Sequence, residues 1–333
     1  MRAKGQHKRN TYIYVIYKII ERNQSGVKIA FMNLCHTDPD IVARAAARLT
    51  RNHDFDMYVH VDNKTEIDPF VSALSGIRGV YFTDERINYY WGGFNAVKAT
   101  VMMLRQALGS ERHYDYFVIL QNLDYPARSN DYIQRFFREH TGTEFIRGCR
   151  IARSADWHFA KKYKIYNRRD DDFYIKKHSR PRMYARYAHM LARSAGTLFS
   201  NGVVREAGIY YDLYYGAAQW AITRELAQYI VEFYDSHPEF NRYMSHVQFP
   251  DEVYFHTIVH NSQYKYRCIK YDEPVKRWLV NWRNLHYYEY PYMITVLTEM
   301  DYNKIMDDGA LFIRKVRSGV SDRLLDMLDL NVD

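Results

Sequence analysis

The stretch FDMYVHVDNKT, residues 55–65, is an apolar run that turns polar at Asp62, a pattern typical of a buried β-strand. Three further segments share this pattern and are predicted as strands: 27–37, 79–85 and 114–129. Segments with apolar residues at helical spacing alternate with them and are predicted as helices: 38–51, 94–108 and 129–140. This alternation predicts an α/β fold with a mainly parallel sheet flanked by helices.

Ligands of such sheets lie at the carboxyl ends of the strands. Asp62, the turn Trp91-Gly92-Gly93 and Asp124 are all expected at this edge. The first predicted strand is not followed by GxGxxG, and the chain has no GxxxxGK[ST], so the sequence supports neither a dinucleotide-binding site nor a P-loop.

The bulk composition is that of a globular protein of one α/β domain or two smaller ones, with 333 residues of which 47% are hydrophobic. Its 32 tyrosines suit clefts that bind polar rings or chains, or they reflect lineage bias. The three cysteines form no CxxC pair, which argues against disulfide and zinc-thiolate frameworks and favours a cytoplasmic protein. The apolar run near the N-terminus contains Lys18 and is too short for a signal peptide or a membrane span.

The net charge of +8 is concentrated in one segment. Residues 153–193 hold 12 lysines and arginines against 4 aspartates, so the rest of the chain is neutral overall. A basic segment with interleaved aromatic residues favours an anionic partner: nucleic acid, a lipid surface or an acidic glycan. A solvated surface insertion is the alternative. No nucleic-acid-binding motif frames the segment, so nucleic acid is the weaker option.

The stretch FPDEVYFHTIVH, residues 249–260, carries Glu252, His256 and His260 at helical spacing. A zinc site of the common helical type would need the motif HExxH, which this stretch lacks. Glu252 and His260 would also be about 12 Å apart along a helix at 1.5 Å per residue, too far to bind one ion. Pro250 suits a first helical turn, where the helix dipole favours an ionised carboxylate and hence a general base. Metal site, structural helix and catalytic carboxylate all remain open at this point.

The stretch GALFIRKVRS, residues 309–318, clusters Arg314, Lys315 and Arg317 behind an apolar pair. Fixed cations of this kind neutralise a departing diphosphate in an enzyme that lacks a metal, or they form a solvated basic tail. A DxD metal-binding pair does not follow any predicted strand, because Asp170-Asp171-Asp172 lies within the basic segment.

Several segments, taken in order, resemble the core-2/I-branching β-1,6-N-acetylglucosaminyltransferase family (glycosyltransferase family 14), which has peptide O-xylosyltransferase relatives. The matching pieces are 58–65 (YVHVDNKT), 89–108, 115–126, 214–230, 249–262, 277–282 (RWLVNW) and 301–316. They span almost the whole chain, and it is their joint order that carries the resemblance.

The resemblance implies a GT-A-type, Rossmann-like fold and an inverting, metal-independent transfer of GlcNAc or xylose from a UDP-sugar. Its motifs make Glu252 the base that deprotonates the acceptor hydroxyl, and they place Lys315 on the diphosphate. The remaining assignments are Asp62 on uridine, Trp91, Gly92 and Asp124 on the donor side, and Trp282, Gln219 and Trp220 on the acceptor side. The family's second diphosphate cation has no exact counterpart, which leaves Arg314 or Arg283. Gln219, where xylosyltransferase-like members carry an aspartate, favours the mechanism based on Glu252.

The resemblance also sets expectations for the setting of the reaction. We expect no cofactor or metal, a glycan or lipid-linked glycan as acceptor, and a role in bacterial surface polysaccharide synthesis in the cytoplasm or at the inner face of the plasma membrane. The alternative is a non-enzymatic protein that binds polyanions or membranes through 153–193. The expected organisation is a basic N-terminal extension (1–26), one catalytic domain (27–320) and a C-terminal tail (321–333). Within the domain we expect a nucleotide-binding half (27–145), the basic insertion (146–200) and an acceptor and catalytic half (201–320).

Overall fold

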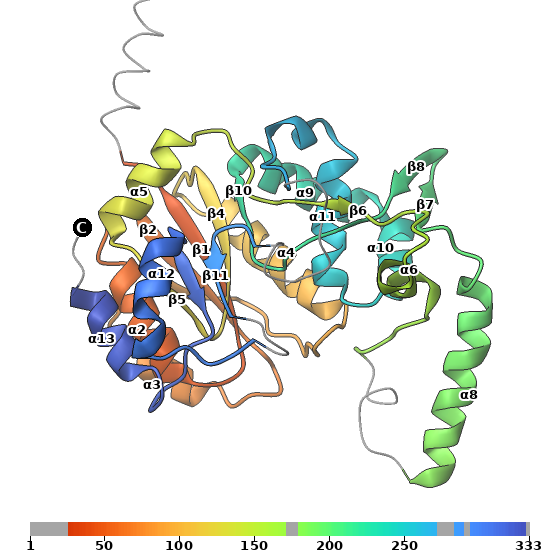
Figure 1. Cartoon of the computed structure of the whole chain (residues 1–333), viewed down its shortest axis with the longest axis horizontal. Helices are drawn as coiled ribbons and strands as arrows, with labels where there is room; N and C mark the ends of the chain where they lie inside the picture. Colours follow the sequence, from red (N-terminus) through yellow and green to blue (C-terminus); the bar gives the residue numbers. More distant parts are fainter. Residues whose placement is uncertain (1–25, 171–178, 272–282, 290–293, 331–333) are drawn as a thin grey trace, which may run out of the picture.

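A computed structural model describes residues 26–170, 179–271, 283–289 and 294–330. A five-stranded sheet with the order β10-β4-β1-β2-β3 lies at its centre (Figure 1). The strands are β1 (Ile29–Cys35), β2 (Phe55–Val61), β3 (Val80–Phe82), β4 (Tyr116–Gln121) and β10 (Ala221–Thr223). All neighbouring strands are parallel except β10, which is antiparallel to β4. The mainly parallel α/β sheet predicted from the sequence is therefore confirmed.

Helices cover both faces of this sheet, so its central strands are buried on both sides. Ala30 and Met32 of β1 pack in the same core cluster as α4 (Asn95–Leu108) and α9 (Arg224–Ser236). Phe31, on the opposite face of the same strand, packs in the cluster of α2, α3 and α5. These last helices are α2 (Pro39–Leu49), α3 (Asp68–Leu74) and α5 (Asn130–Glu139).

The predicted strand at 114–129 is divided between two sheets. β4 ends at Gln121, the chain turns through Asn122 at a φ of 23°, and β5 (Asp124–Pro126) pairs with β12 (Phe312–Arg314). β11 (His286–Tyr287) completes this second, three-stranded sheet. Asp124 therefore begins a strand of the second sheet rather than ending β4, which corrects the sequence-based prediction.

The C-terminal segment is packed against the body of the protein. α13 (Asp322–Leu330) buries Leu324, Leu325 and Leu328 in the cluster that includes α12 (Tyr302–Asp308). Arg44 of α2 bonds to Asp329 at 2.7 Å. The described part of the segment expected as a tail, 321–333, is thus a helix of the folded domain.

The middle of the chain, residues 146–268, builds most of the other side of the molecule (Figure 1). Its helices are α6 (Trp157–Lys164), α8 (Arg180–Thr197), α10 (Pro238–Met244) and α11 (Tyr254–His260), with short 3-10 turns at η1 (Pro250–Glu252) and η2 (Gln263–Arg267). Its strands are the pairs β6 (Cys149–Arg150) with β9 (Tyr214–Tyr215) and β7 (Val203–Glu206) with β8 (Ile209–Asp212). A further 3-10 turn, η4 (Glu299–Asp301), precedes α12 and packs against α12 and α13. None of the helices in the described ranges has the length and apolar character needed to cross a membrane. The N-terminal extension, apart from residue 26, and the segment 277–282 of the family resemblance lie outside the described residues.

Candidate functional site

A cavity of about 620 Å³ opens at the carboxyl ends of β1, β2 and β4. Its lining includes the residues that directly follow these strands: His36, Asp62 and Asn122. Seven of the residues singled out from the sequence line this cavity: Asp62, Trp91, Gly92, Gln219, Trp220, Glu252 and Arg314. The edge predicted to hold a ligand is therefore hollow, and distant segments converge on it.

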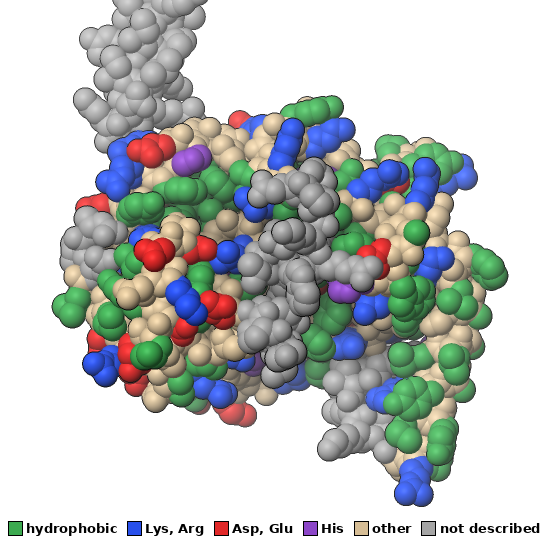
Figure 2. Space-filling model, viewed as in Figure 1, with side chains coloured by type: hydrophobic (Ala, Val, Ile, Leu, Met, Phe, Trp, Pro, Cys, Tyr) green, Lys and Arg blue, Asp and Glu red, His purple; other side chains and the backbone are tan. Residues whose placement is uncertain are grey.

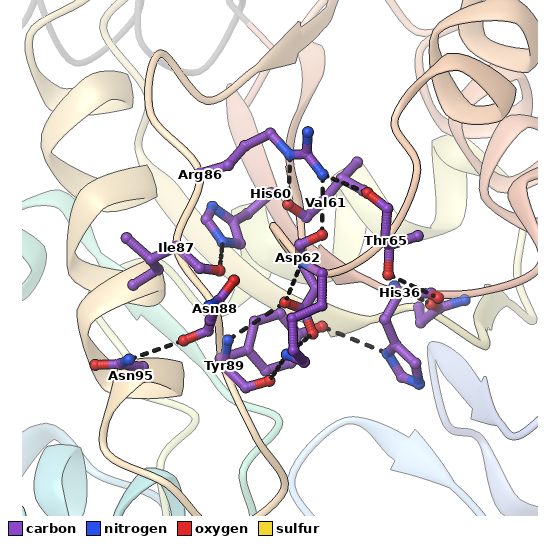
Figure 3. Close-up of polar contacts among 12 residues, drawn as sticks. His36, His60, Val61, Asp62, Thr65, Arg86, Ile87, Asn88, Tyr89 and Asn95 are labelled. Carbon is purple, nitrogen blue, oxygen red and sulfur yellow. Dashed lines mark hydrogen bonds and ion pairs between the residues drawn. The ribbon is translucent and has the colours of Figure 1, made fainter. Parts of the chain in front are cut away.

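The loop after β2 is held in place by the side chains of Arg86 and Asp62, which bond to its backbone (Figure 3). Arg86 donates to three carbonyl oxygens, those of Val61 (3.0 Å), Asp62 (3.0 Å) and Thr65 (2.5 Å). The Asp62 carboxylate accepts a bond from the backbone N–H of Lys64 at 3.1 Å and forms an ion pair with the Lys64 ammonium group. Asp62 is almost fully buried, so its side chain has a fixed position at the cavity wall.

The Trp91-Gly92 turn forms the rim of the cavity. Gly92 has a φ of +76°, a left-handed conformation that favours glycine, and a Cβ there would lie 3.1 Å from the Phe249 ring. Trp91 is 77% exposed. The centroid of its ring lies 4.7 Å from the centroid of the Phe249 ring and 5.1 Å from the Arg169 guanidinium group. A large aromatic surface is thus held open to solvent beside the cavity, an arrangement suited to stacking on a sugar ring.

Asp170 has a structural role. Its carboxylate accepts bonds from the backbone N–H groups of Phe94 (2.7 Å) and Asn95 (3.1 Å), which begin α4. It therefore caps the N-terminus of a core helix from a distant part of the chain, as a carboxylate does favourably.

Glu252 reaches the cavity from a 3-10 turn rather than from the first turn of an α-helix. η1 ends at Glu252, and α11 begins only at Tyr254. A helical turn beginning at Pro250 carries Glu252, as expected, but it is a separate 3-10 turn, so the expectation of one helix continuing to His260 is wrong. The dipole of the short helix α11 is also a weaker influence on Glu252 than expected, since Glu252 precedes its first residue.

A buried lysine lies next to Glu252. The Lys162 ammonium is 3.5 Å from Glu252 Oε2 and 3.8 Å from the centroid of the Tyr215 ring. The Tyr215 hydroxyl also makes a side-chain hydrogen bond to Glu252. Burial lowers the pKa of Lys162, while the charge of Glu252 opposes this effect. Lys162 belongs to α6, within the basic segment, and no sequence motif distinguishes it from the other lysines there.

Asp251 shares the cavity wall with Glu252. Burial, followed by the negative charge of Glu252, raises the pKa of Asp251 well above its ordinary value. The Asp251 and Glu252 carboxyl groups thus differ in their surroundings, because the Lys162 ammonium group forms its ion pair with Glu252.

Arg314 also lines the cavity and is held by Asp124 at 2.6 Å and by the Gln121 carbonyl at 3.0 Å. Asp124 is fully buried and also lies 3.3 Å from His286 Nε2. Burial opposes its ionisation, but the charge of Arg314 and the bond with His286 outweigh burial and lower the pKa of Asp124. Asp124 therefore positions Arg314 and does not itself line the cavity.

Lys315 follows Arg314 but is not among the residues that line the cavity. Its backbone carbonyl accepts a bond from the Leu297 N–H at 2.9 Å. Arg283, the other candidate cation, forms an ion pair with Asp308 at 3.0 Å. Of the three candidates for the diphosphate, the structure brings Arg314 to the cavity.

The residues assigned to the acceptor side are only partly described. The Gln219 amide donates to Gln121 Oε1 at 2.9 Å, and Trp220 is buried with its ring 5.0 Å from that of Phe255. Trp282 lies outside the described residues.

Both histidines of α11 bind backbone carbonyls. His256 Nε2 lies 3.0 Å from the Ala217 oxygen, and His260 Nε2 lies 3.1 Å from the Ile146 oxygen. Burial lowers the pKa of each ring. Within the described ranges, no group of three or more His, Cys, Asp or Glu residues is arranged to hold a metal ion. The structural alternative thus accounts for both histidines.

Comparison with known proteins shows which proteins this chain resembles. A family model described as "Branch: Core-2/I-Branching enzyme" matches residues 29–306. The chain is 23% identical to human (Homo sapiens) xylosyltransferase 2 over 243 residues, which is 71% of this chain and 25% of that protein. It is also 23% identical to xylosyltransferase 1 of Canis lupus familiaris over 249 residues, 71% of this chain and 22% of that protein. The chain thus spans about a quarter of the length of these curated relatives.

Proposed function

Because the chain belongs to the Core-2/I-branching enzyme family, we propose that it is a glycosyltransferase that moves a sugar from a UDP-sugar to a glycan hydroxyl. The observation that carries this proposal is one cavity that is lined by both Glu252 and Arg314. A base and a fixed cation in one cavity are what transfer from a nucleoside diphosphate requires.

Glu252 acts as the general base in the proposed reaction. Its carboxylate takes the proton of the acceptor hydroxyl while the oxygen forms a bond to the anomeric carbon of the donor. The bond from this carbon to the diphosphate oxygen breaks at the same time, and the electron pair leaves with UDP. A single displacement of this kind inverts the anomeric centre. Lys162 and Tyr215 hold the Glu252 carboxylate in place for this step.

Arg314 stabilises the leaving group in the proposed reaction. Negative charge develops on the diphosphate as the bond breaks, and a preorganised guanidinium group is suited to stabilise it without a metal. Asp124 and the Gln121 carbonyl fix the orientation of Arg314 before substrate binds. Lys315 is adjacent in sequence and is proposed as a second cation at the diphosphate. The proposed donors are UDP-xylose and UDP-GlcNAc.

Asp62 and the Trp91-Gly92 rim are proposed to bind the donor, and Gln219, Trp220 and Trp282 the acceptor. The proposed setting is the cytoplasm, in the synthesis of a bacterial surface polysaccharide. Free thiols support the cytoplasmic part of this proposal, because Cys35, Cys149 and Cys268 form no disulfide.

A panel of UDP-sugars tests the proposal. UDP and at least one UDP-sugar should raise the thermal midpoint, and UDP should be released when a glycan acceptor is added, with or without EDTA. Activity that EDTA removes and manganese restores would refute the metal-independent mechanism. If no UDP-sugar stabilises the protein, and polyanions bind it with a steep salt dependence, the non-enzymatic alternative is correct.

A further inference from the structure

The helix α8 (Arg180–Thr197) projects from the body of the protein, and none of its described side chains is buried (Figure 1). Bonds near its C-terminal end attach it to the end of α6 and to the residues just after it. The Thr197 hydroxyl donates to the Lys164 carbonyl at 2.7 Å, and the Tyr166 N–H donates to Ser194 Oγ at 3.1 Å. Packing in the protein core therefore does not explain the apolar residues of this helix.

These apolar residues form one stripe. Tyr184, Tyr187, Leu191 and Leu198 are 65%, 49%, 72% and 46% exposed. At about 100° per residue, their spacing places all four within about 60° of arc around the helix axis. Phe199 follows in the turn after the helix and is 93% exposed. Figure 2 shows hydrophobic side chains gathered along this projecting part of the molecule.

The charges of the region favour an anionic partner for the stripe. The four charged side chains of α8 are all arginines, and it has no acidic residue. The neighbouring helix α6 adds Lys161 and Lys164, which are partly exposed in its last turn, and Trp157 at its start is 54% exposed. A second copy of the chain would oppose one basic helix with another, so like charges disfavour pairing through this face. An anionic bilayer surface accommodates both the aromatic and aliphatic stripe and the arginines.

We propose that α8 and the Leu198-Phe199 turn lie in the surface of an anionic lipid bilayer. The apolar stripe is buried at the boundary between head groups and acyl chains, and the long arginine side chains reach the phosphate groups. With 18 residues and four arginines, the helix lies on the bilayer and does not cross it.

This orientation brings the rim of the catalytic cavity close to the membrane. A second cavity of about 440 Å³ is lined by Arg186 and Tyr187 of α8 and by Tyr90 and Trp91. The last two residues also line the catalytic cavity. An acceptor attached to a lipid would therefore reach the site from the side of α8. The membrane contact itself does not depend on the sugar-transfer activity.

Sedimentation of the full chain with vesicles tests the proposal. The protein should bind vesicles of phosphatidylcholine containing one third phosphatidylglycerol and should bind phosphatidylcholine alone much more weakly. The double variant Leu191→Ser with Phe199→Ser should weaken binding by about tenfold or more, because each buried apolar side chain contributes strongly to partitioning. Met300→Ser, which changes an 83% exposed apolar residue elsewhere, is the matched control and should leave binding unchanged.

The charge contribution is tested by Arg182→Gln with Arg193→Gln. This pair should weaken binding to the anionic vesicles and lower its salt dependence, with the same thermal midpoint as the wild type. Failure of the wild type to bind anionic vesicles would overturn the proposal, as would equal binding to neutral and anionic vesicles. Dimerisation in solution that is lost in the Leu191→Ser, Phe199→Ser variant would assign the stripe to a second copy instead. Assays of UDP release in solution report on the proposed transferase independently of these results.

Discussion

Acidification should destabilise this protein through His256, which lies in α11 beside the cavity that is the candidate active site. The ring is fully buried, and burial, followed by the charge of His260, lowers its pKa to about 3. In the unfolded chain the same ring titrates near 6.5. As the pH falls below about 6.5 the unfolded state takes up a proton that the native state does not, so the free energy of unfolding decreases. At about pH 5 the difference of 1.5 pH units from the unfolded pKa corresponds to about 2 kcal/mol.

Urea unfolding of the wild type and of His256→Gln at about pH 7.5 and about pH 5 measures this contribution. The glutamine amide can still donate to the Ala217 carbonyl but does not titrate. The variant should be less stable at the higher pH, yet it should lose about 2 kcal/mol less than the wild type on acidification. His53→Gln, at an exposed position, is the control and should lose as much stability as the wild type. Equal losses in the wild type and His256→Gln would refute the reasoning.

Three further predictions concern the cavity. Lys162→Met should lower the rate of sugar transfer by about tenfold or more, because Glu252 loses its nearest cation, while calorimetry shows unchanged UDP affinity. Arg314→Gln should weaken UDP binding by about 1.5–3 kcal/mol, the usual contribution of hydrogen bonds to charged groups, and equal affinity in calorimetry would contradict its role. Gly92→Ala should lower the free energy of unfolding in urea by about 1–2 kcal/mol, because a residue with a side chain is strained at its φ of +76°. Gly196→Ala, in the exposed helix α8, should not lower it, because an added Cβ there would meet no atom within 4 Å.

The architecture was predictable where burial is simple. Each central strand is covered on both faces, which produces the continuous apolar runs seen at 27–37 and 55–65, and the helices show the matching apolar periodicity. The division of the segment 114–129 was not predictable from local pattern. Asp124 leaves the first sheet because its carboxylate binds Arg314, a residue distant in sequence, and because β5 pairs with β12.

The site residues at the strand ends were predictable from the sequence, whereas contacts between segments distant in sequence were not. Asp62 and Gly92 follow from the rule that ligands of parallel sheets lie at the carboxyl edge, and the structure places both at the cavity. The contact of Lys162 with Glu252 joins α6 to η1, and no local sequence pattern predicts such a pair. The expected helical start at Pro250 is present, but its 3-10 turn ends at Glu252 and does not continue into α11, a break that the local sequence pattern does not mark.

The most direct test of the proposed mechanism is the transfer rate of Glu252→Gln. The substitution keeps the shape of the side chain but removes its capacity to take the acceptor proton. Transfer should fall by at least about a hundredfold, the lower limit for loss of a general base, while UDP affinity stays the same. Glu232→Gln, at an exposed position of α9, is the control and should retain full activity. A Glu252→Gln variant that transfers sugar at the wild-type rate would contradict the central claim that Glu252 is the catalytic base.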